Sequence, residues 1–291
     1  MNTDKILLKI PIKSLSIQEQ LEQKLLNLLI NSELCKVALS SLKQNSRSLS
    51  RLSQVTPIIY RWAIAMQLSR QSSVSPLDLA EQIVSSLVIH RDEYQQFPQL
   101  TFSLKLVEPG WLDFQLCDRA LAIWLDYCLQ AELPQLSPKN QSIDPDHLFS
   151  IQSAYARSCS LLRLGEQQGL IKLNNPNFND LVQLYPFGSP IPWLIGGKTC
   201  RLTHPTELAL ISQIITTVDR IKNDSTWSGN QLTSRLSHFF WNFERFCRIF
   251  GEVAQEYPAL AQGRLGLVAV SQRLLQWLWY SQMGTFPRSH L

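Results

Sequence analysis

The chain has 291 residues and a formal net charge of +4 at pH 7, a length that allows two domains of ordinary size with separate hydrophobic cores. Six widely spaced cysteines without a CxxC pair argue against a zinc site and against a compact disulfide framework. The weak positive charge permits an RNA partner without requiring one, because dedicated nonspecific nucleic-acid binders carry dense Lys/Arg clusters.

The N-terminus, from Met1 to Lys5, has no basic segment followed by a long apolar run, so it does not resemble a secretory signal. Charged or polar residues interrupt every apolar run before it reaches the length of a membrane span. We therefore expect a cytoplasmic protein without a membrane partner.

Three helices are predicted in the first ninety residues. Apolar residues at helical spacing indicate an amphipathic helix over 16–42, and a second helix is predicted over 58–68. Ser75, followed by Pro76 and Asp78, is typical of a capped helix start. The third helix should therefore begin at Pro76 and run to about residue 87.

A change of period follows these helices. Residues 101–107 and 111–116 alternate apolar and polar side chains, with a turn at 108–110 between them, which predicts two paired strands. Residues 1–131 are therefore expected to form a small α+β domain in which helices cover one face of a short sheet. A polar, proline-containing linker is predicted over 132–145.

From residue 146 to 291 the pattern is helical, apart from a loop at about 173–200 that is rich in Asn, Pro and Gly. One helix should start at Pro205 and Glu207, and the last should cover about 258–280. Between them, phenylalanines at 239, 243, 246 and 250 predict an aromatic stripe along one helix face. We expect Phe246 and Cys247 to be core residues of an all-α bundle, which makes the whole chain mainly α.

Three segments of the helical half resemble arginyl-tRNA synthetase. Residues 152–157, Gln-Ser-Ala-Tyr-Ala-Arg, are similar to the Gln-Tyr-Ala-His-Ala-Arg motif that opens the family's anticodon-binding (DALR) domain. Residues 204–210 resemble its His-Pro-x-Glu-x-x-Leu segment, and residues 264–268 its closing Arg-Leu-x-Leu helix. The resemblance covers about 146–287 and implies a helical bundle of the DALR anticodon-binding type.

The N-terminal half is similar to the additional domain at the start of the same enzyme. Residues 75–83 resemble its Asn-Pro-x-x-Ile-Ala-Glu-x-Ile helix, and residues 108–116 its Gly-Pro-Gly-aromatic-apolar-Asn-Phe-x-Leu strand. Between these two regions the family carries a nucleotide-binding core with His-Ile-Gly-His and Lys-Met-Ser-Lys-Ser motifs. Here that place is taken by 132–145, none of the five histidines begins such a motif, and no glycine-rich phosphate loop occurs. We therefore expect no catalytic residues, no cofactor and no metal.

The resemblance implies RNA-contacting positions in both halves. On the D-loop side these are Trp111, which could stack on a base or pack in the sheet, and Asp113. The family has Asn in place of Asp113, and a carboxylate cannot donate to a base and repels phosphate. On the anticodon side, Tyr155 replaces the family's His and could stack or pack, while Arg157 could contact the RNA stem or close a salt bridge within the bundle.

Further anticodon-side candidates lie on the phenylalanine-rich helix. Their cationic and amide groups, beside a tryptophan, fit the stacking and edge hydrogen bonding by which single-stranded RNA is recognised. A solvated helix face is the alternative. The positions at i, i+3, i+7 and i+10 are Arg235, His238, Asn242 and Arg245, with Trp241 and Arg248 on the adjoining surface.

These observations favour a non-catalytic, synthetase-derived protein that binds tRNA, with tRNA-Arg among the candidates and a tRNA-modifying enzyme as a candidate protein partner. One alternative is a protein-interaction scaffold that retains the synthetase flanking folds without RNA binding. Another is arginine–tRNA ligase activity, or an accessory subunit of such an enzyme, which conflicts with the missing ATP site.

Overall fold

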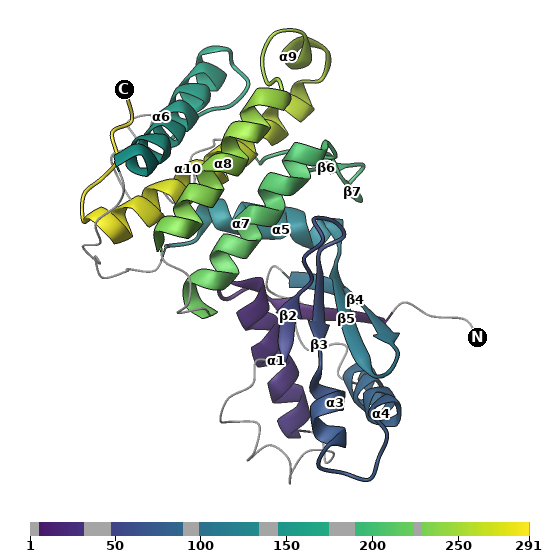
Figure 1. The fold of residues 1–291 in the computed structure, drawn as a ribbon. Coiled ribbons are helices and arrows are strands. Elements are labelled where there is room, and N and C mark those ends of the chain that lie inside the picture. Colours follow the sequence, from purple (N-terminus) through teal and green to yellow (C-terminus); the bar gives the residue numbers. More distant parts are fainter. Residues whose placement is uncertain are drawn as a thin grey trace. The chain divides into compact units, whose positions relative to one another are not determined.

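The computed structural model describes residues 6–31, 48–89, 99–133, 145–174, 190–223 and 229–290. It is mainly helical with a small antiparallel sheet (Figure 1), which confirms the predicted mainly α fold with an N-terminal sheet. The chain divides into two compact units, Met1–Ile123 and Trp124–Leu291. The division falls within helix α5 (Asp118–Gln130). Residues 134–144 of the predicted linker lie outside the described part of the chain.

The first unit is built on a five-stranded antiparallel sheet with the strand order β1-β4-β5-β3-β2. The predicted strand pair is confirmed as β4 and β5, which are joined at Gly110 with a φ of +144°. A Cβ atom at Gly110 would lie 2.7 Å from the Pro76 carbonyl oxygen, so this turn requires glycine. The strands are β1 (Ile6–Pro11), β2 (Leu49–Arg51), β3 (Ile59–Trp62), β4 (Gln99–Val107) and β5 (Trp111–Leu116).

The helix predicted over 58–68 is wrong in its first half. Residues 59–62 form strand β3, and only α3 (Ile64–Ser69) is helical. Tyr60 and Trp62 are fully buried whereas Ile59 and Arg61 are partly exposed, which is the period of a strand. The apolar strand runs directly into the apolar helix, so the sequence presented one continuous hydrophobic segment. Strands β1 and β2 were not predicted at all.

Two of the predicted helices of this unit are present. Helix α1 (Ile17–Asn31) matches the start of the segment predicted over 16–42, and residues 32–42 lie outside the described part. Helix α4 (Pro76–Ile89) has the predicted cap: the Asp78 amide donates to Ser75 Oγ at 3.1 Å. The Ser75 hydroxyl in turn donates to the Asp78 carboxylate at 2.7 Å. This reciprocal pair explains why the helix begins at Pro76.

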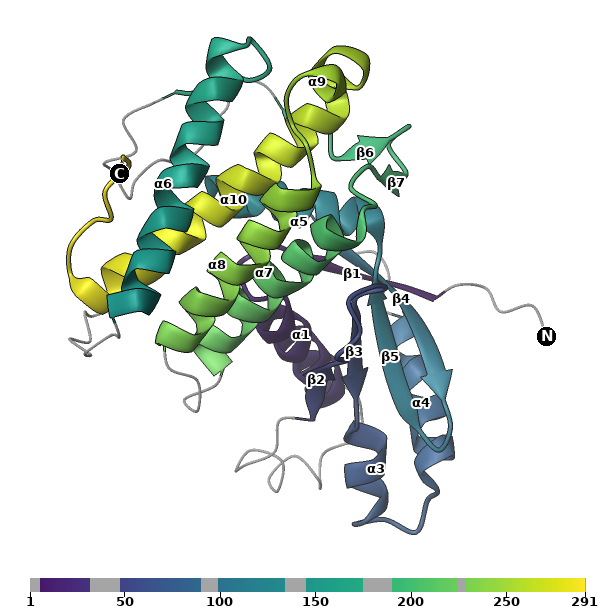
Figure 2. The same ribbon diagram turned by 45° about the horizontal axis from the view of Figure 1, so that its top comes forward.

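The two faces of the sheet have different environments. Side chains such as Phe102 and Phe114 are fully buried on one face, and α1 and α4 contact strands of the sheet. In Figure 2 helix α4 lies behind the β4–β5 pair. At the alternate positions, Lys105 and Gln115 are exposed and Trp111 is partly exposed, whereas Asp113 is buried. The sheet therefore has one face that forms the core of the unit and one face with polar, partly accessible side chains.

The second unit is a bundle organised around helix α10 (Figure 1), which contacts α6, α7 and α8. Nearly all of its side chains from Ala261 to Gln282 are buried. The helix starts predicted at Pro205 and near residue 258 are confirmed by α7 and α10. The remaining elements are α6 (Pro145–Gln167), β6 (Leu194–Ile195), β7 (Thr199–Cys200), α7 (Pro205–Asn223), α8 (Gly229–Phe246), α9 (Glu252–Glu256) and α10 (Pro258–Met283).

Gly266 allows the segment before α7 to pack closely against α10. Trp193 and Ile191, in the described part of the predicted loop, lie directly over Gly266. The Trp193 indole also donates to Asp126 Oδ1 at 2.7 Å, and burial raises the pKa of that carboxyl group. The loop is thereby attached both to α10 and to the second half of α5.

We predict that Gly266→Ala destabilises the protein, because a Cβ atom there would lie 2.6 Å from Trp193 and 2.8 Å from Ile191. The expected loss is about 1–3 kcal/mol in the free energy of unfolding. Gly263→Ala in the same helix is the matched control, since its nearest neighbour would be 3.5 Å away, and it should gain up to about 1 kcal/mol from helix propensity. Thermal unfolding of both variants checks this; equal shifts would contradict it.

Candidate nucleic-acid interface

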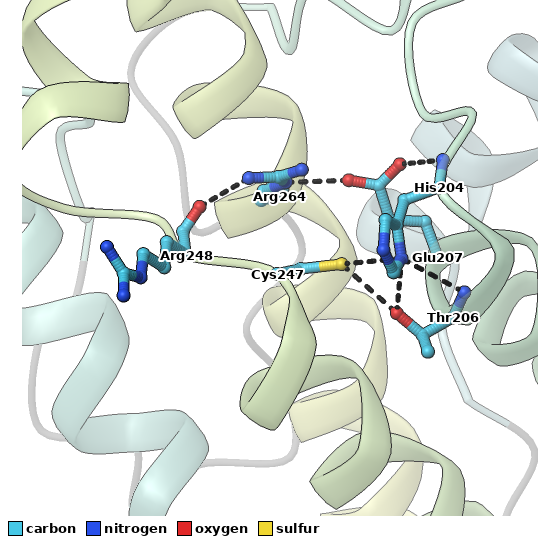
Figure 3. Close-up of polar contacts among 6 residues, drawn as sticks. All are labelled: His204, Thr206, Glu207, Cys247, Arg248 and Arg264. Atoms are coloured by element: carbon cyan, nitrogen blue, oxygen red, sulfur yellow. Dashed lines mark hydrogen bonds and ion pairs between the residues drawn. The ribbon is translucent and has the colours of Figure 1, made fainter.

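Two of the segments that carry the synthetase resemblance meet in the helical unit (Figure 3). Glu207 accepts a hydrogen bond from the His204 backbone amide through Oε2 at 2.8 Å. Its other oxygen, Oε1, accepts from Arg264 Nε at 2.6 Å. Arg264 also donates to the backbone carbonyl of Arg248. This arrangement fixes the start of α7, the segment after α8 and the first half of α10 to one another.

Cys247 lies beside this ion pair and is buried, as predicted. Its Sγ is 3.1 Å from Thr206 Oγ1 and 3.4 Å from His204 Nδ1 (Figure 3). Burial raises the pKa of the thiol, so the cysteine remains protonated at neutral pH. Nucleophilic and metal-binding cysteines act as thiolates, and Cys247 is therefore a packing residue.

The predicted aromatic stripe is displaced by one position at its start and interrupted at its end. Phe240 and Phe243 are fully buried, whereas Phe239 is only partly buried. Phe246, expected in the core, is 57% exposed. The reason is that the buried side of α8 passes through Phe243 and then Cys247, which turns Phe246 at the helix end toward solvent. An aromatic side chain is thus accessible where the sequence predicted a buried one.

The outer face of α8 has the predicted composition. Arg235, His238 and Arg245 are exposed and Asn242 is partly exposed, and we call these four residues the α8 ridge. His238 Nε2 and Asn242 Nδ2 are 3.1 Å apart. The Arg245 guanidinium lies over the ring of Phe246, 5.4 Å from its centroid. Helix α8 therefore presents the cations and the amide of the ridge, and the accessible aromatic ring of Phe246 lies next to Arg245.

The tryptophan beside the ridge is less accessible than its neighbours. Trp241 is partly buried, and its ring meets Phe240 edge-on at a centroid distance of 5.9 Å. Arg248, the last candidate on this side, has an exposed side chain, while its carbonyl holds Arg264.

The α6 candidates are engaged within the bundle. Tyr155 is fully buried, and burial raises the pKa of its hydroxyl group well above the usual range. Of the two expected roles, stacking on RNA or packing in the core, its position is that of a packed side chain. Arg157 forms a salt bridge within the bundle, which is the second of its two expected roles. Its Nε and Nη2 donate to the same oxygen of Glu244, Oε1, at 3.0 and 2.6 Å.

Helix α6 also holds the segment that follows α10, a contact that sequence reasoning missed. Gln152 donates to the Arg288 carbonyl at 2.6 Å and accepts from the Arg288 amide at 3.0 Å. Arg163 donates to the Ser289 carbonyl at 3.0 Å. The ring of Phe286 stacks on Tyr280 at a centroid distance of 5.0 Å. Backbone atoms are the partners of Gln152 and Arg163, so no residue pattern in the sequence could have revealed these two contacts.

On the accessible face of the sheet, Trp111 and Asp113 are joined by an arginine that was not predicted. Arg61 Nε and Nη2 donate to the two oxygens of Asp113, each at 2.7 Å. The guanidinium lies 5.4 Å from the centroid of the Trp111 ring, and the hydrogen bond with Asp113 raises the pKa of Arg61. Arg61 therefore offsets the negative charge of Asp113. The sequence concealed this group because Arg61 fell in a segment predicted to be helical.

Comparisons of the chain with protein-family models, with curated proteins and with solved structures find no match. No helix in the described ranges is long and apolar enough to cross a membrane. Within those same ranges, no group of three or more His, Cys, Asp or Glu side chains could hold a metal ion. The functional proposal consequently depends on the motif residues and on the side-chain geometry given above.

Gln152→Ala is predicted to release the segment around Arg288 from α6. Losing the hydrogen bonds to the Arg288 backbone should weaken the attachment of this segment to α6 by about 1 kcal/mol. The fraction of molecules in which the segment is detached should then rise about fivefold. Trypsin cleavage after Arg288, followed by mass spectrometry, should become faster by that factor. Gln167→Ala, at an exposed position of the same helix, is the control, and equal cleavage rates in both variants would contradict the prediction.

Asp113→Asn should destabilise the protein by about 1–2 kcal/mol, because the amide cannot accept both guanidinium hydrogen bonds. The measurement is the urea midpoint of unfolding for Asp113→Asn, Arg61→Gln and the double variant. If the pair is responsible, Asp113→Asn costs much less in the Arg61→Gln background. An equal cost in both backgrounds would show that the stabilisation comes from elsewhere.

Proposed function

We propose that this chain is a non-catalytic RNA-binding protein whose ligand is tRNA. The observation that carries the proposal is the α8 ridge, where the side chains of Arg235, His238 and Arg245 are exposed on the helix that ends with the exposed Phe246. Cations bind the phosphate backbone, whereas exposed rings and amides contact unpaired bases. Such a set is suited to a single-stranded loop flanked by a duplex, as in an anticodon arm.

The packing of the motif residues supports the proposal. Residues 204–207 and Arg264, which were matched separately to the synthetase family, contact each other through the Glu207 ion pair. On this proposal the helical unit contacts the anticodon arm. The open sheet face around Trp111 contacts the D-loop, and a tRNA-modifying enzyme is the proposed kind of protein partner.

Removing the two arginines and the histidine of the ridge should weaken binding. The triple variant Arg235→Gln, His238→Gln, Arg245→Gln is expected to bind a purified tRNA pool at least about tenfold more weakly at low salt, where phosphate contacts are strongest. Mobility-shift titrations at two salt concentrations measure this. The control is Lys172→Gln, Lys198→Gln, which removes exposed cations elsewhere in the same unit. Absence of binding by the natural chain at low salt would refute the proposed function.

A protein-interaction scaffold is the second candidate, and a different observation favours it. Tyr155 is fully buried, and Asp113 and Arg157 are held in ion pairs, so three candidate RNA contacts are occupied within the protein. Affinity capture followed by RNA sequencing and mass spectrometry separates the two functions. Enrichment of tRNA would refute the scaffold, whereas a stoichiometric protein partner without RNA would support it.

A further inference from the structure

Helix α8 contains one acidic residue, Glu244. The same helix carries Arg235, His238 and Arg245 of the ridge, and Arg245 is the next residue along the chain. Glu244 accepts both hydrogen bonds from Arg157 of α6 through a single oxygen, Oε1. Successive residues of a helix point about 100° apart, so Glu244 lies on the flank of α8 that contacts α6 rather than on the ridge, and its carboxylate is bound there to a cation.

The pair is accessible to solvent. The side chains of Arg157 and Glu244 are 47% and 23% exposed. A second ion pair of the same unit, Arg264 with Glu207, is only 11% and 1% exposed, and Glu207 uses both oxygens. Exposed ion pairs contribute about 0–1 kcal/mol, so Arg157 can exchange its partner at little cost, whereas Arg264 cannot.

A guanidinium group binds carboxylate and phosphate with the same paired donors. We propose that Glu244 is an internal competitor for RNA: it occupies Arg157 in the free protein, and a phosphate of the bound RNA displaces it. This inference rests on the proposed function and concerns the contact of Arg157 with the same RNA. The displaced carboxylate remains close to the phosphate and repels it, so Glu244 limits the affinity of the natural protein.

The experiment measures tRNA affinity for the natural chain, Glu244→Gln, Arg157→Gln and the double variant. Glu244→Gln should bind about threefold to tenfold more tightly, because the competing charge is lost while the side-chain size is kept. Arg157→Gln should bind more weakly, and Glu244→Gln should add little in that background. Glu252→Gln, which removes an exposed acid of α9, is the matched control and should change affinity less than twofold, by about the effect of a screened distant charge.

Three results would overturn the inference: no gain in Glu244→Gln, an equal gain in Glu252→Gln, or an undiminished gain in the Arg157→Gln background. The last two would show a general charge effect. Thermal unfolding without RNA identifies any variant that fails to fold, and Glu244→Ala then replaces Glu244→Gln. Failure of both the natural chain and Glu244→Gln to bind tRNA would refute the proposed function itself, whereas binding with unchanged affinity refutes only the role of Glu244.

Discussion

The ion pair between Glu207 and Arg264 is the constraint on which the helical unit depends. It is almost completely buried and joins the first turn of α7 to α10, while the same arginine holds the chain just after α8. Removing one partner of such a pair leaves an uncompensated buried charge, which typically costs about 3–5 kcal/mol. The end of α8 is therefore fixed by a contact that lies outside that helix.

Local patterns were sufficient where the determining interaction is local. Ser75 and Asp78 bond within one helix turn, and β4 and β5 pair across a short turn, so the sequence predicted both. Nonlocal interactions were not predictable in the same way. Arg61 was placed in a helix because strand β3 is recognisable only from its pairing with β5. Gln152 binds backbone atoms far along the chain, and backbone partners have no residue identity to detect. Phe246 was misplaced because the buried side of α8 runs through Phe240, Phe243 and Cys247, a phase that the spacing of the phenylalanines does not specify.

Three arginine ion pairs of the described residues differ in whether the arginine could leave its carboxylate for a ligand. Arg264 is enclosed and its partner has no spare oxygen, so this pair is structural. Arg61 donates one hydrogen bond to each carboxylate oxygen of Asp113, and its guanidinium lies over the ring of Trp111. The three side chains therefore hold one another in place on the sheet. Of these three pairs, the Arg157 pair combines a single accepting oxygen with high exposure. All three pairs join an arginine to a carboxylate. The residue types alone therefore do not show which arginine is available to a ligand.

The modest net charge has a consequence for how such a protein could select RNA. Affinity from phosphate neutralisation rises with the number of cations that contact the backbone, and α8 supplies few of these, one of which lies beside Glu244. Binding of useful strength must then include stacking and base-edge contacts, which are worth about 1–3 kcal/mol for each stacked base. These contacts require unpaired bases, which a duplex does not offer. On the proposed function, the few cations of the α8 ridge and the exposed ring of Phe246 next to it would favour looped RNA over duplex RNA, and the weakness of the charge would contribute to that selectivity.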